Sequence, residues 1–184
     1  ELVKDPEFAG LKTGERLVLV HSGSRERGQD VYNKMLEGEE YVETHNNLID
    51  FASKNRKRIL QRIEEHSGVH LDVILESTHN FLEISENEII YRNGAVRLLP
   101  GEFGIIPSSM GGNAVIVKAK PRISEIRNSI SHGSGRKVSR SEARNVHYDF
   151  DSLRKRVYIP GMISNEDIWT ENPNCYNDME SVLT

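Results

Sequence analysis

The sequence predicts a mixed α/β domain, of the α+β kind, because it combines one long amphipathic stretch with several short apolar runs. The long stretch has apolar residues at helical spacing over about residues 40–65. The short runs are rich in β-branched residues or alternate apolar with polar positions, as strands do. A chain of 184 residues is long enough for one domain with its own hydrophobic core. We therefore expect a single domain whose histidines and small residues lie mainly in loops between strands.

The expected helix spans about residues 40–65. Its apolar positions recur largely at helical spacing and share one face: Val42, Leu48, Ile49, Ala52, Ile59, Leu60 and Ile63. Charged residues fill the other face: Lys54, Arg56, Lys57, Arg58, Arg62 and Glu64. Gly68 follows as the expected stop.

Two strands are predicted to end next to histidines. Residues 16–20 form a short apolar, β-branched run that predicts a buried strand ending at His21. Residues 69–75 alternate apolar with polar positions, which predicts a strand leading to the loop at His79. Side chains in loops at strand ends are where α/β folds commonly place their chemistry.

A β-hairpin is expected where residues 81–84 and 89–92 flank a polar turn at residues 85–88. Arg92-Asn93-Gly94-Ala95 follows, and its Asn-Gly pair is typical of a type I′ hairpin turn. Further strands are expected at residues 104–106, 115–118 and 157–159, and helices are expected after Ser139 and over residues 177–183.

Composition limits the function classes. No apolar run approaches the ~20 residues that a membrane-spanning helix needs, so no association with a membrane is expected. The formal net charge of -4 gives no global signature for nucleic-acid binding, so any site for a polyanion must be local. The single cysteine, Cys175, cannot form an internal disulfide and fits a reducing compartment, which predicts a cytoplasmic protein.

Two short stretches carry the clearest site pattern, because each places a histidine before small residues and an arginine. They are His21-Ser22-Gly23-Ser24-Arg25 and His132-Gly133-Ser134-Gly135-Arg136. Glycine and serine let backbone N–H groups approach an anion, arginine binds phosphate oxygens, and histidine can be a metal ligand or a nucleophile. With His79-Asn80 between them, they favour a phosphate-handling enzyme. Taken alone, the second stretch fits a Gly-rich loop with solvated basic residues about equally well.

The remaining motifs have ordinary interpretations when taken singly. Pro107-Ser108-Ser109-Met110-Gly111-Gly112 predicts a tight turn with exposed amides and hydroxyls. Four other histidines are expected to be surface or packing residues: His45, His66, His70 and His147.

Taken in order, these motifs resemble those of the RtcB family of GTP-dependent RNA ligases, which act in transfer RNA splicing. Besides the two histidine stretches, the matching pieces are Ala52-Ser53-Lys54-Asn55-Arg56, His79-Asn80, Arg92-Asn93-Gly94-Ala95, Ile106-Pro107-Ser108-Ser109-Met110-Gly111, Ser139-Arg140 and Glu171-Asn172-Pro173-Asn174-Cys175-Tyr176-Asn177-Asp178. Several motifs in a fixed order are more specific than any one of them. The resemblance implies an α/β fold with a metal and nucleotide cleft, and residues 1–184 are expected to form most of its catalytic domain.

The resemblance also implies a mechanism. His132 would be the nucleophile that attacks the α-phosphate of GTP and forms a histidine–GMP adduct. GMP would then pass to an RNA 3′-phosphate, which arises from a 2′,3′-cyclic phosphate, and an RNA 5′-hydroxyl would displace GMP to seal the strand. Two manganese ions would bind the triphosphate and withdraw charge from the reacting phosphorus. Such chemistry serves tRNA splicing or RNA repair.

Individual positions take their expected roles from the same resemblance. His21 and His79 match metal-binding histidines, and Arg25 and Arg136 match phosphate-holding positions. The nucleotide-contacting positions are Asn80, Pro107, Ser108, Ser109, Met110, His132, Gly133, Ser134, Gly135 and Tyr176, with Tyr176 stacking on guanine.

The chain departs from the family pattern at several places. An upstream Asp-x-Cys metal motif, a Gly-Asn-His-Phe motif and a C-terminal guanine-contacting lysine do not occur in it. Asn93 stands where the family has lysine, Ala114 falls where a serine is usual, and Glu26-Arg27 interrupt the usual Ser-Arg-Gly run.

These departures leave two alternative functions open. One is a metal-dependent phosphoesterase on RNA ends, which needs no GTP. The other is a non-catalytic module that binds RNA ends through a basic cluster of Arg136, Lys137, Arg140 and Arg144, with strong salt dependence.

Overall fold

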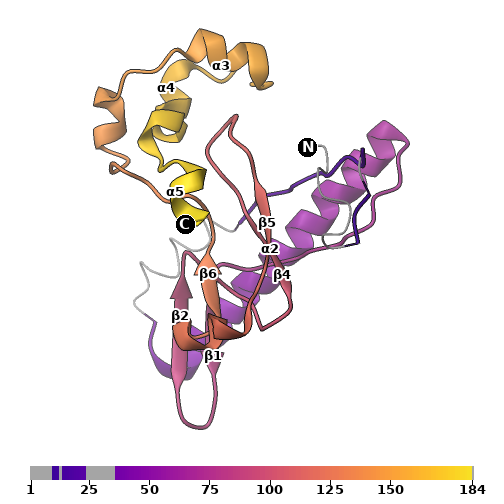
Figure 1. The fold of residues 1–184 in the computed structure, drawn as a ribbon, viewed down its shortest axis with the longest axis vertical. Coiled ribbons are helices and arrows are strands. Elements are labelled where there is room, and N and C mark those ends of the chain that lie inside the picture. Colours follow the sequence, from indigo (N-terminus) through magenta and orange to yellow (C-terminus); the bar gives the residue numbers. More distant parts are fainter. Residues whose placement is uncertain (1–9, 13, 24–35, 184) are drawn as a thin grey trace. The chain divides into compact units, whose positions relative to one another are not determined.

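The computed structural model describes residues 10–12, 14–23 and 36–183 (Figure 1). The chain forms two compact units, Glu1–Arg92 and Asn93–Thr184, each of which is described by itself. The elements mix helices and strands, which confirms the predicted mixed α/β class. The assignment of residues 1–184 to one catalytic domain stays a prediction.

The first unit is built around α2, Gly38–Ser67, the long helix expected from the apolar periodicity. Gly68 ends it as predicted, because it adopts a left-handed conformation (φ 68°) and its N–H donates to Glu64 O at 2.8 Å. His45 is a packing residue, as expected: it is buried on α2 with its ring near those of Tyr41 and Tyr91. Burial lowers the pKa of His45, so the ring stays neutral in the core.

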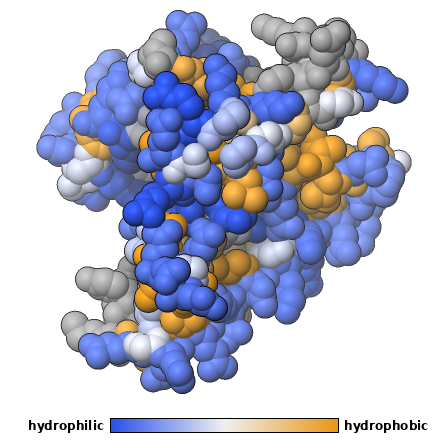
Figure 2. Space-filling model, turned by 60° about the horizontal axis from the view of Figure 1, so that its bottom comes forward, coloured by the Kyte–Doolittle hydropathy of each residue, from blue (hydrophilic) through white to orange (hydrophobic). Residues whose placement is uncertain are grey.

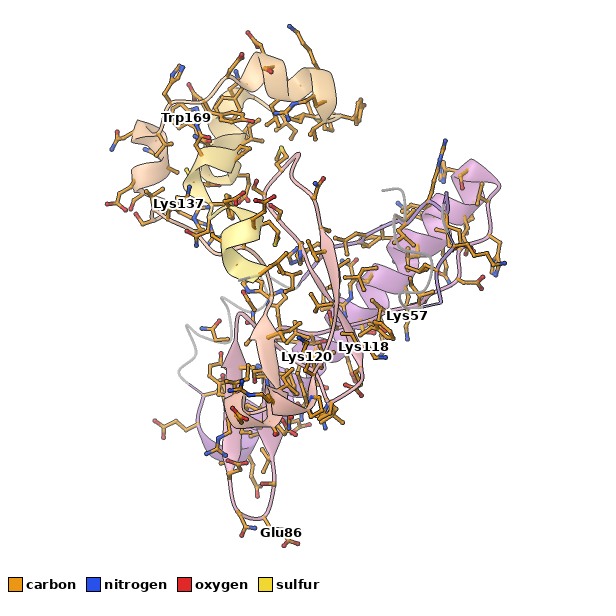
Figure 3. The ribbon with its side chains drawn as sticks, viewed as in Figure 1. Lys57, Glu86, Lys118, Lys120, Lys137 and Trp169 are labelled. Carbon is orange, nitrogen blue, oxygen red and sulfur yellow. The ribbon has the colours of Figure 1, made fainter. Side chains whose placement is uncertain are left out.

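The predicted hairpin forms from β1, Asn80–Ile84, and β2, Ile89–Asn93, and β1 packs against α2. Ser85 N donates to Glu88 O at 2.9 Å to close the turn, with Glu86 at its tip (Figure 3). Arg92 of β2 is buried, and its Nη1 lies 2.6 Å from Glu83 Oε2 of β1.

Two predicted strands of this unit are wrong. Residues 16–20 and 69–75 are apolar enough to form strands, yet neither is one in the structure. Val69 and Val73 remain 57% and 61% exposed, so no sheet covers them. Instead, the Glu64 carboxylate accepts the N–H of Leu71 at 2.8 Å, which ties the segment back to the end of α2.

The second unit contains two antiparallel strand pairs. β3, Ala95–Arg97, pairs with β6, Ser129–Ser131, and β4, Phe103–Ile106, pairs with β5, Val115–Lys118. The 3₁₀ helix η1, Pro121–Ile126, contributes Ile123 to a small core with Leu98 and Ala119. The predicted hairpin turn at Asn93-Gly94 is wrong, because β3 pairs with β6 rather than with β2.

Short helices complete this unit. They are η2 Glu142–Asn145, α3 Phe150–Arg156, α4 Asn165–Ile168, η3 Trp169–Glu171, η4 Pro173–Cys175 and α5 Met179–Leu183 (Figure 1). The helix expected after Ser139 is therefore a 3₁₀ turn, and the one expected over residues 177–183 is α5. The strand predicted at residues 157–159 is wrong: Val157 ends α3, and Tyr158 is 90% exposed.

Buried side chains hold the helical segments together. Leu153, Asn172 and Cys175 are almost fully enclosed, and Asn172 Nδ2 donates to Val146 O at 2.8 Å. On the face drawn in Figure 2, hydrophilic residues cover most of the surface around smaller hydrophobic patches. No helix within the described part of the chain is long and apolar enough to cross a membrane.

Candidate functional site

His132 follows β6 directly and makes two contacts with the backbone carbonyl of Gly94. Its own N–H donates to Gly94 O at 3.2 Å, and its imidazole Nδ1 lies 2.6 Å from the same oxygen. Because a carbonyl oxygen only accepts hydrogen bonds, Nδ1 must carry the proton. In the neutral imidazole, the lone pair therefore belongs to Nε2.

Gly94 can hold His132 in this way only because it has no side chain. Its φ of 72° lies in the left-handed region, where a Cβ is strained. A Cβ at this position would also lie 3.1 Å from both Cε1 and Nδ1 of the His132 ring. The Asn-Gly pair thus builds a cradle for the histidine, not a hairpin turn.

The loop after His132 lies against two other predicted motifs. An ideal Cβ on Gly133 would be 3.3 Å from Pro107 O, which brings the serine turn beside this loop. Gly135 has φ 73°, and a Cβ there would be 3.2 Å from Asn177 Nδ2. Three other segments, at Gly94, Pro107 and Asn177, thus lie against His132 and the three residues that follow it.

Ser134 is the buried polar residue of this loop. It is 4% exposed, and within the part of the chain that the structure describes its Oγ has no hydrogen-bond partner. A buried hydroxyl without a partner is costly, so it fits a position that a ligand oxygen completes. Its backbone carbonyl is already occupied, since Asn177 Nδ2 donates to it at 3.1 Å.

The serine turn is compact. Gly112 N donates to Ser109 O at 2.9 Å, and a Cβ on Gly112 would be 2.6 Å from Ser108 Oγ. Gly111, with φ 78°, rests on Leu153 of α3. The turn keeps its predicted residues partly exposed at the surface of the second unit: Pro107, Ser108, Ser109 and Met110.

Arg136 makes its contacts within the protein. Its Nε donates to Val138 O at 3.1 Å, and its Nη1 donates to Tyr176 Oη at 2.9 Å and to Thr170 O. Its guanidinium carbon lies 4.8 Å from the centre of the Tyr176 ring. The structure thus joins Arg136 to Tyr176, and the phosphate role expected for Arg136 stays a prediction.

The two predicted metal ligands of the first unit lie side by side. The ring centres of His21 and His79 are 5.5 Å apart with an interplanar angle of 81°. Asn80 begins β1 next to His79 and is exposed. Arg25, expected to hold phosphate, lies outside the described residues.

α2 anchors the segment that carries His21. Asn55 Nδ2 donates to Ser22 Oγ at 2.7 Å, and Arg56 Nη1 donates to Ser22 O at 3.2 Å. Arg56 is oriented in turn by Glu76, with Nη2 3.0 Å from Oε1. The Ala52–Arg56 motif thus has a structural role, because Asn55 and Arg56 hold the segment that carries His21.

The two histidines fit part of a metal site. Imidazole nitrogen suits Mn²⁺ when harder or anionic ligands join it. Among residues 10–12, 14–23 and 36–183, no group of three His, Cys, Asp or Glu side chains is arranged to hold an ion. The metal-ligand roles of His21 and His79 stay a prediction.

Three residues of the His132 environment were not predicted as site residues: Gly94, Glu171 and Asn177. Glu171 Oε2 accepts the phenolic O–H of Tyr176 at 2.6 Å. All three residues lie in motifs that match the family, so the motifs point to their positions. Their individual roles depend on contacts with residues distant in the sequence, which the motifs do not reveal.

Comparisons with known proteins agree with the motif order. The family model described as tRNA-splicing ligase RtcB matches residues 33–184. The chain is similar to RNA-splicing ligase RtcB2 of Escherichia coli (strain ATCC 25922), with 29% identity over 200 residues covering 96% of this chain and 52% of that protein. It is also similar to tRNA-splicing ligase RtcB of Pyrococcus horikoshii, with 24% identity covering 97% of this chain and 28% of that protein. The chain thus spans about half the length of the first relative and less of the second.

Proposed function

The chain belongs to the RtcB family of tRNA-splicing ligases, and from this we propose that the protein joins RNA 3′-phosphate or 2′,3′-cyclic phosphate ends to 5′-hydroxyl ends. The observation that carries the proposal is the cradle around His132: one carbonyl fixes Nδ1, and a Gly/Ser loop follows. The substrates are RNA ends in tRNA splicing or RNA repair, in the cytoplasm.

The first step of the proposed reaction uses Nε2 of His132 as the nucleophile. Its lone pair attacks the α-phosphorus of GTP, an N–P bond forms, and pyrophosphate leaves with the electrons of the broken P–O bond. The Nδ1 proton stays in its hydrogen bond to Gly94 O, which stabilises the positive charge that develops on the ring. RNA 3′-phosphate then takes GMP from the histidine, and the 5′-hydroxyl displaces GMP.

The nucleotide would be held by backbone and small side chains. The Pro107–Met110 turn and the Gly133–Gly135 loop lie together in the second unit, and Ser134 Oγ is the unsatisfied hydroxyl among them. Tyr176 would stack on guanine. Arg25 and Arg136 would contribute positive charge for phosphate, and Asn80 would contact the nucleotide.

Manganese is the proposed metal, with two ions in the complete site. When bound, it supplies Lewis-acid chemistry at the triphosphate. His21 and His79 would hold it through their imidazole nitrogens. Asn55 and Arg56 orient the segment that carries His21.

The test is covalent labelling of the full-length protein with α-labelled GTP and Mn²⁺. The wild-type protein is expected to retain the label after denaturation, and the His132→Ala variant is expected to lose it. His147→Ala is the matched control, because His147 is an exposed loop histidine of the same unit. Label retained in full by His132→Ala would overturn the nucleophile assignment.

Assays on the same full-length protein also test the two alternative functions. Release of phosphate from 3′-phosphate RNA without GTP would replace the ligase by a phosphoesterase. Salt-sensitive RNA binding with no adduct would replace it by an RNA-end-binding module.

A further inference from the structure

The hydroxyl group of Tyr176 makes two hydrogen bonds, one as acceptor and one as donor. Its Oη accepts a hydrogen bond from Arg136 Nη1 at 2.9 Å and donates one to Glu171 Oε2 at 2.6 Å. We call Glu171, Tyr176 and Arg136 the tyrosine clamp. Both bonds involve a charged partner, which makes them stronger than bonds between neutral groups.

Arg136 lies over one face of the Tyr176 ring. The Arg136 guanidinium carbon lies 4.8 Å from the ring centre, a cation–π contact that covers one face. Arg136 is itself held by the carbonyls of Val138 and Thr170. Its Nη2 is buried without a hydrogen-bond partner among the described residues, so this nitrogen lies away from solvent. A base can therefore stack only on the opposite face of Tyr176.

Backbone bonds join the tyrosine clamp to the loop that follows His132. Arg136 and Tyr176 form an antiparallel bridge. Lys137 N donates to Cys175 O at 2.7 Å, and Asn177 N donates to Gly135 O at 2.9 Å. Figure 3 marks Lys137 on this segment. The position of the Tyr176 ring and that of the loop are thus mechanically linked.

The ionisation of the phenol supports the same arrangement. Burial, followed by the Glu171 carboxylate, raises the pKa of Tyr176, although Arg136 opposes the shift. The phenol therefore keeps its proton near neutral pH and remains able to donate to Glu171.

We propose that Glu171 and Arg136 are positioning residues, which act through Tyr176 to present one ring face to the nucleotide base and to fix that face relative to the His132 loop. The inference rests on the proposed function for the identity of the nucleotide. For Arg136, this role at the ring is additional to the phosphate contact proposed above and does not depend on it.

The first test removes only the hydroxyl, through Tyr176→Phe in the full-length protein. The ring can still stack, but both hydrogen bonds are lost. We expect the KM for GTP in adduct formation to rise about tenfold, while the rate at saturating GTP stays within about threefold of wild type. Tyr148→Phe is the matched control, because Tyr148 also accepts an arginine hydrogen bond, from Arg156, outside the tyrosine clamp. An equal KM in the two variants would overturn the proposal.

The second test asks whether Glu171 acts as a hydrogen-bond acceptor. Glu171→Gln keeps an oxygen that can accept from Tyr176, whereas Glu171→Leu removes it. Glutamine is expected to keep the KM within about threefold of wild type, and leucine to match Tyr176→Phe. Equal effects of the two substitutions on KM would contradict a positioning role through Tyr176.

A third measurement needs no nucleotide. Hydrogen exchange of the Lys137 and Asn177 amides is expected to accelerate about tenfold in Tyr176→Phe and Glu171→Leu, with no change in Tyr148→Phe. Unchanged exchange would overturn the link between the tyrosine clamp and the loop. If the wild-type protein formed no adduct with GTP, the proposed function would fail, and exchange would still decide the structural link.

Discussion

The two histidine regions are positioned by different kinds of contact. In the second unit, His132 is held by the carbonyl of Gly94, and its loop is joined to residues 175–177 by backbone bonds. In the first unit, the segment of His21 is held by the side chains of Asn55 and Arg56 on α2. A nucleophile must keep one nitrogen aimed at one atom, and uncharged backbone contacts suit that task. A metal ligand can tolerate adjustment, because the ion itself draws its ligands together.

The largest expected effect comes from breaking the backbone contact of His132. In Gly94→Ala, the new methyl would lie 3.1 Å from the imidazole at a left-handed φ, so the ring must move. The ring has to shift by a few tenths of an ångström, and misplacing a reacting group by about 1 Å costs about 100-fold, so we expect the rate of histidine–GMP formation to fall by about 10- to 100-fold. The rate is measured with α-labelled GTP on the full-length protein.

Gly101→Ala separates strain from misplacement. Gly101 has a similar φ of 87°, but apart from its chain neighbours no atom of the described residues lies within 4 Å of the position of its missing Cβ. The substitution is expected to cost about 1–2 kcal/mol of stability through backbone strain, as at Gly94, with adduct formation retained. If both variants lost the same activity, the contact between Gly94 and His132 would not be what positions the ring.

An intermediate effect is expected from breaking the side-chain anchor of the other region. Asn55→Ala removes the donor to Ser22 Oγ next to His21. We expect the affinity for Mn²⁺ to fall about tenfold, the lower end of what loss of a residue that orients a metal ligand costs. Electron paramagnetic resonance of free Mn²⁺ during titration of the full-length protein measures it.

The neighbouring Lys54→Ala is the control, because Lys54 is exposed on the same helix. Equal Mn²⁺ affinity in the Asn55→Ala and Lys54→Ala variants would show that this anchor does not act on the proposed metal ligands. In that case the contrast between the two regions would lose its functional meaning.

Local signals in the sequence predicted the local elements. Apolar periodicity and Gly68 predicted α2, and a polar four-residue turn predicted the β1–β2 hairpin. The runs at residues 16–20, 69–75 and 157–159 resemble strands equally well, but a strand needs a partner, and partners are distant in sequence. The backbone N–H of Leu71 donates to the Glu64 carboxylate instead of to a neighbouring strand. The apolar periodicity of the sequence does not indicate such a contact.

The candidate site shows the same limit. The motifs predict His132 and Tyr176 as site residues, and the structure shows which atoms hold these two side chains in place. Gly94 precedes His132 by 38 positions, and Arg136 precedes Tyr176 by 40, so their contacts depend on chain pairing that residue types do not reveal. Asn-Gly predicts a hairpin turn because that is its common local use.

The smallest expected effect is a pH dependence of stability, and we expect it only in the region of His21. A hydrogen bond from Ser53, with further help from Arg56, outweighs burial and lowers the pKa of Glu76 below its usual 4.5. A carboxyl with a lowered pKa in the folded state adds stability that is complete above the unfolded pKa and is lost as pH falls through the folded pKa. Because Glu76 is partly exposed, its contribution is at most about 1 kcal/mol.

We therefore expect Glu76→Gln to lower the free energy of unfolding at pH 7 and to have no effect at a pH below the folded pKa of Glu76, as measured by urea unfolding. Glu86→Gln, with the same charge change at the tip of the β1–β2 turn, should have little effect at either pH.

Protonation of Glu76 also removes the ionic partner that orients Arg56 toward Ser22, so the segment of His21 should loosen in acid. The carbonyl of Gly94 does not titrate, so acid cannot remove the acceptor that fixes Nδ1 of His132. Equal acid sensitivity of backbone hydrogen exchange around His21 and around His132 would contradict the distinction between a side-chain anchor and a backbone cradle.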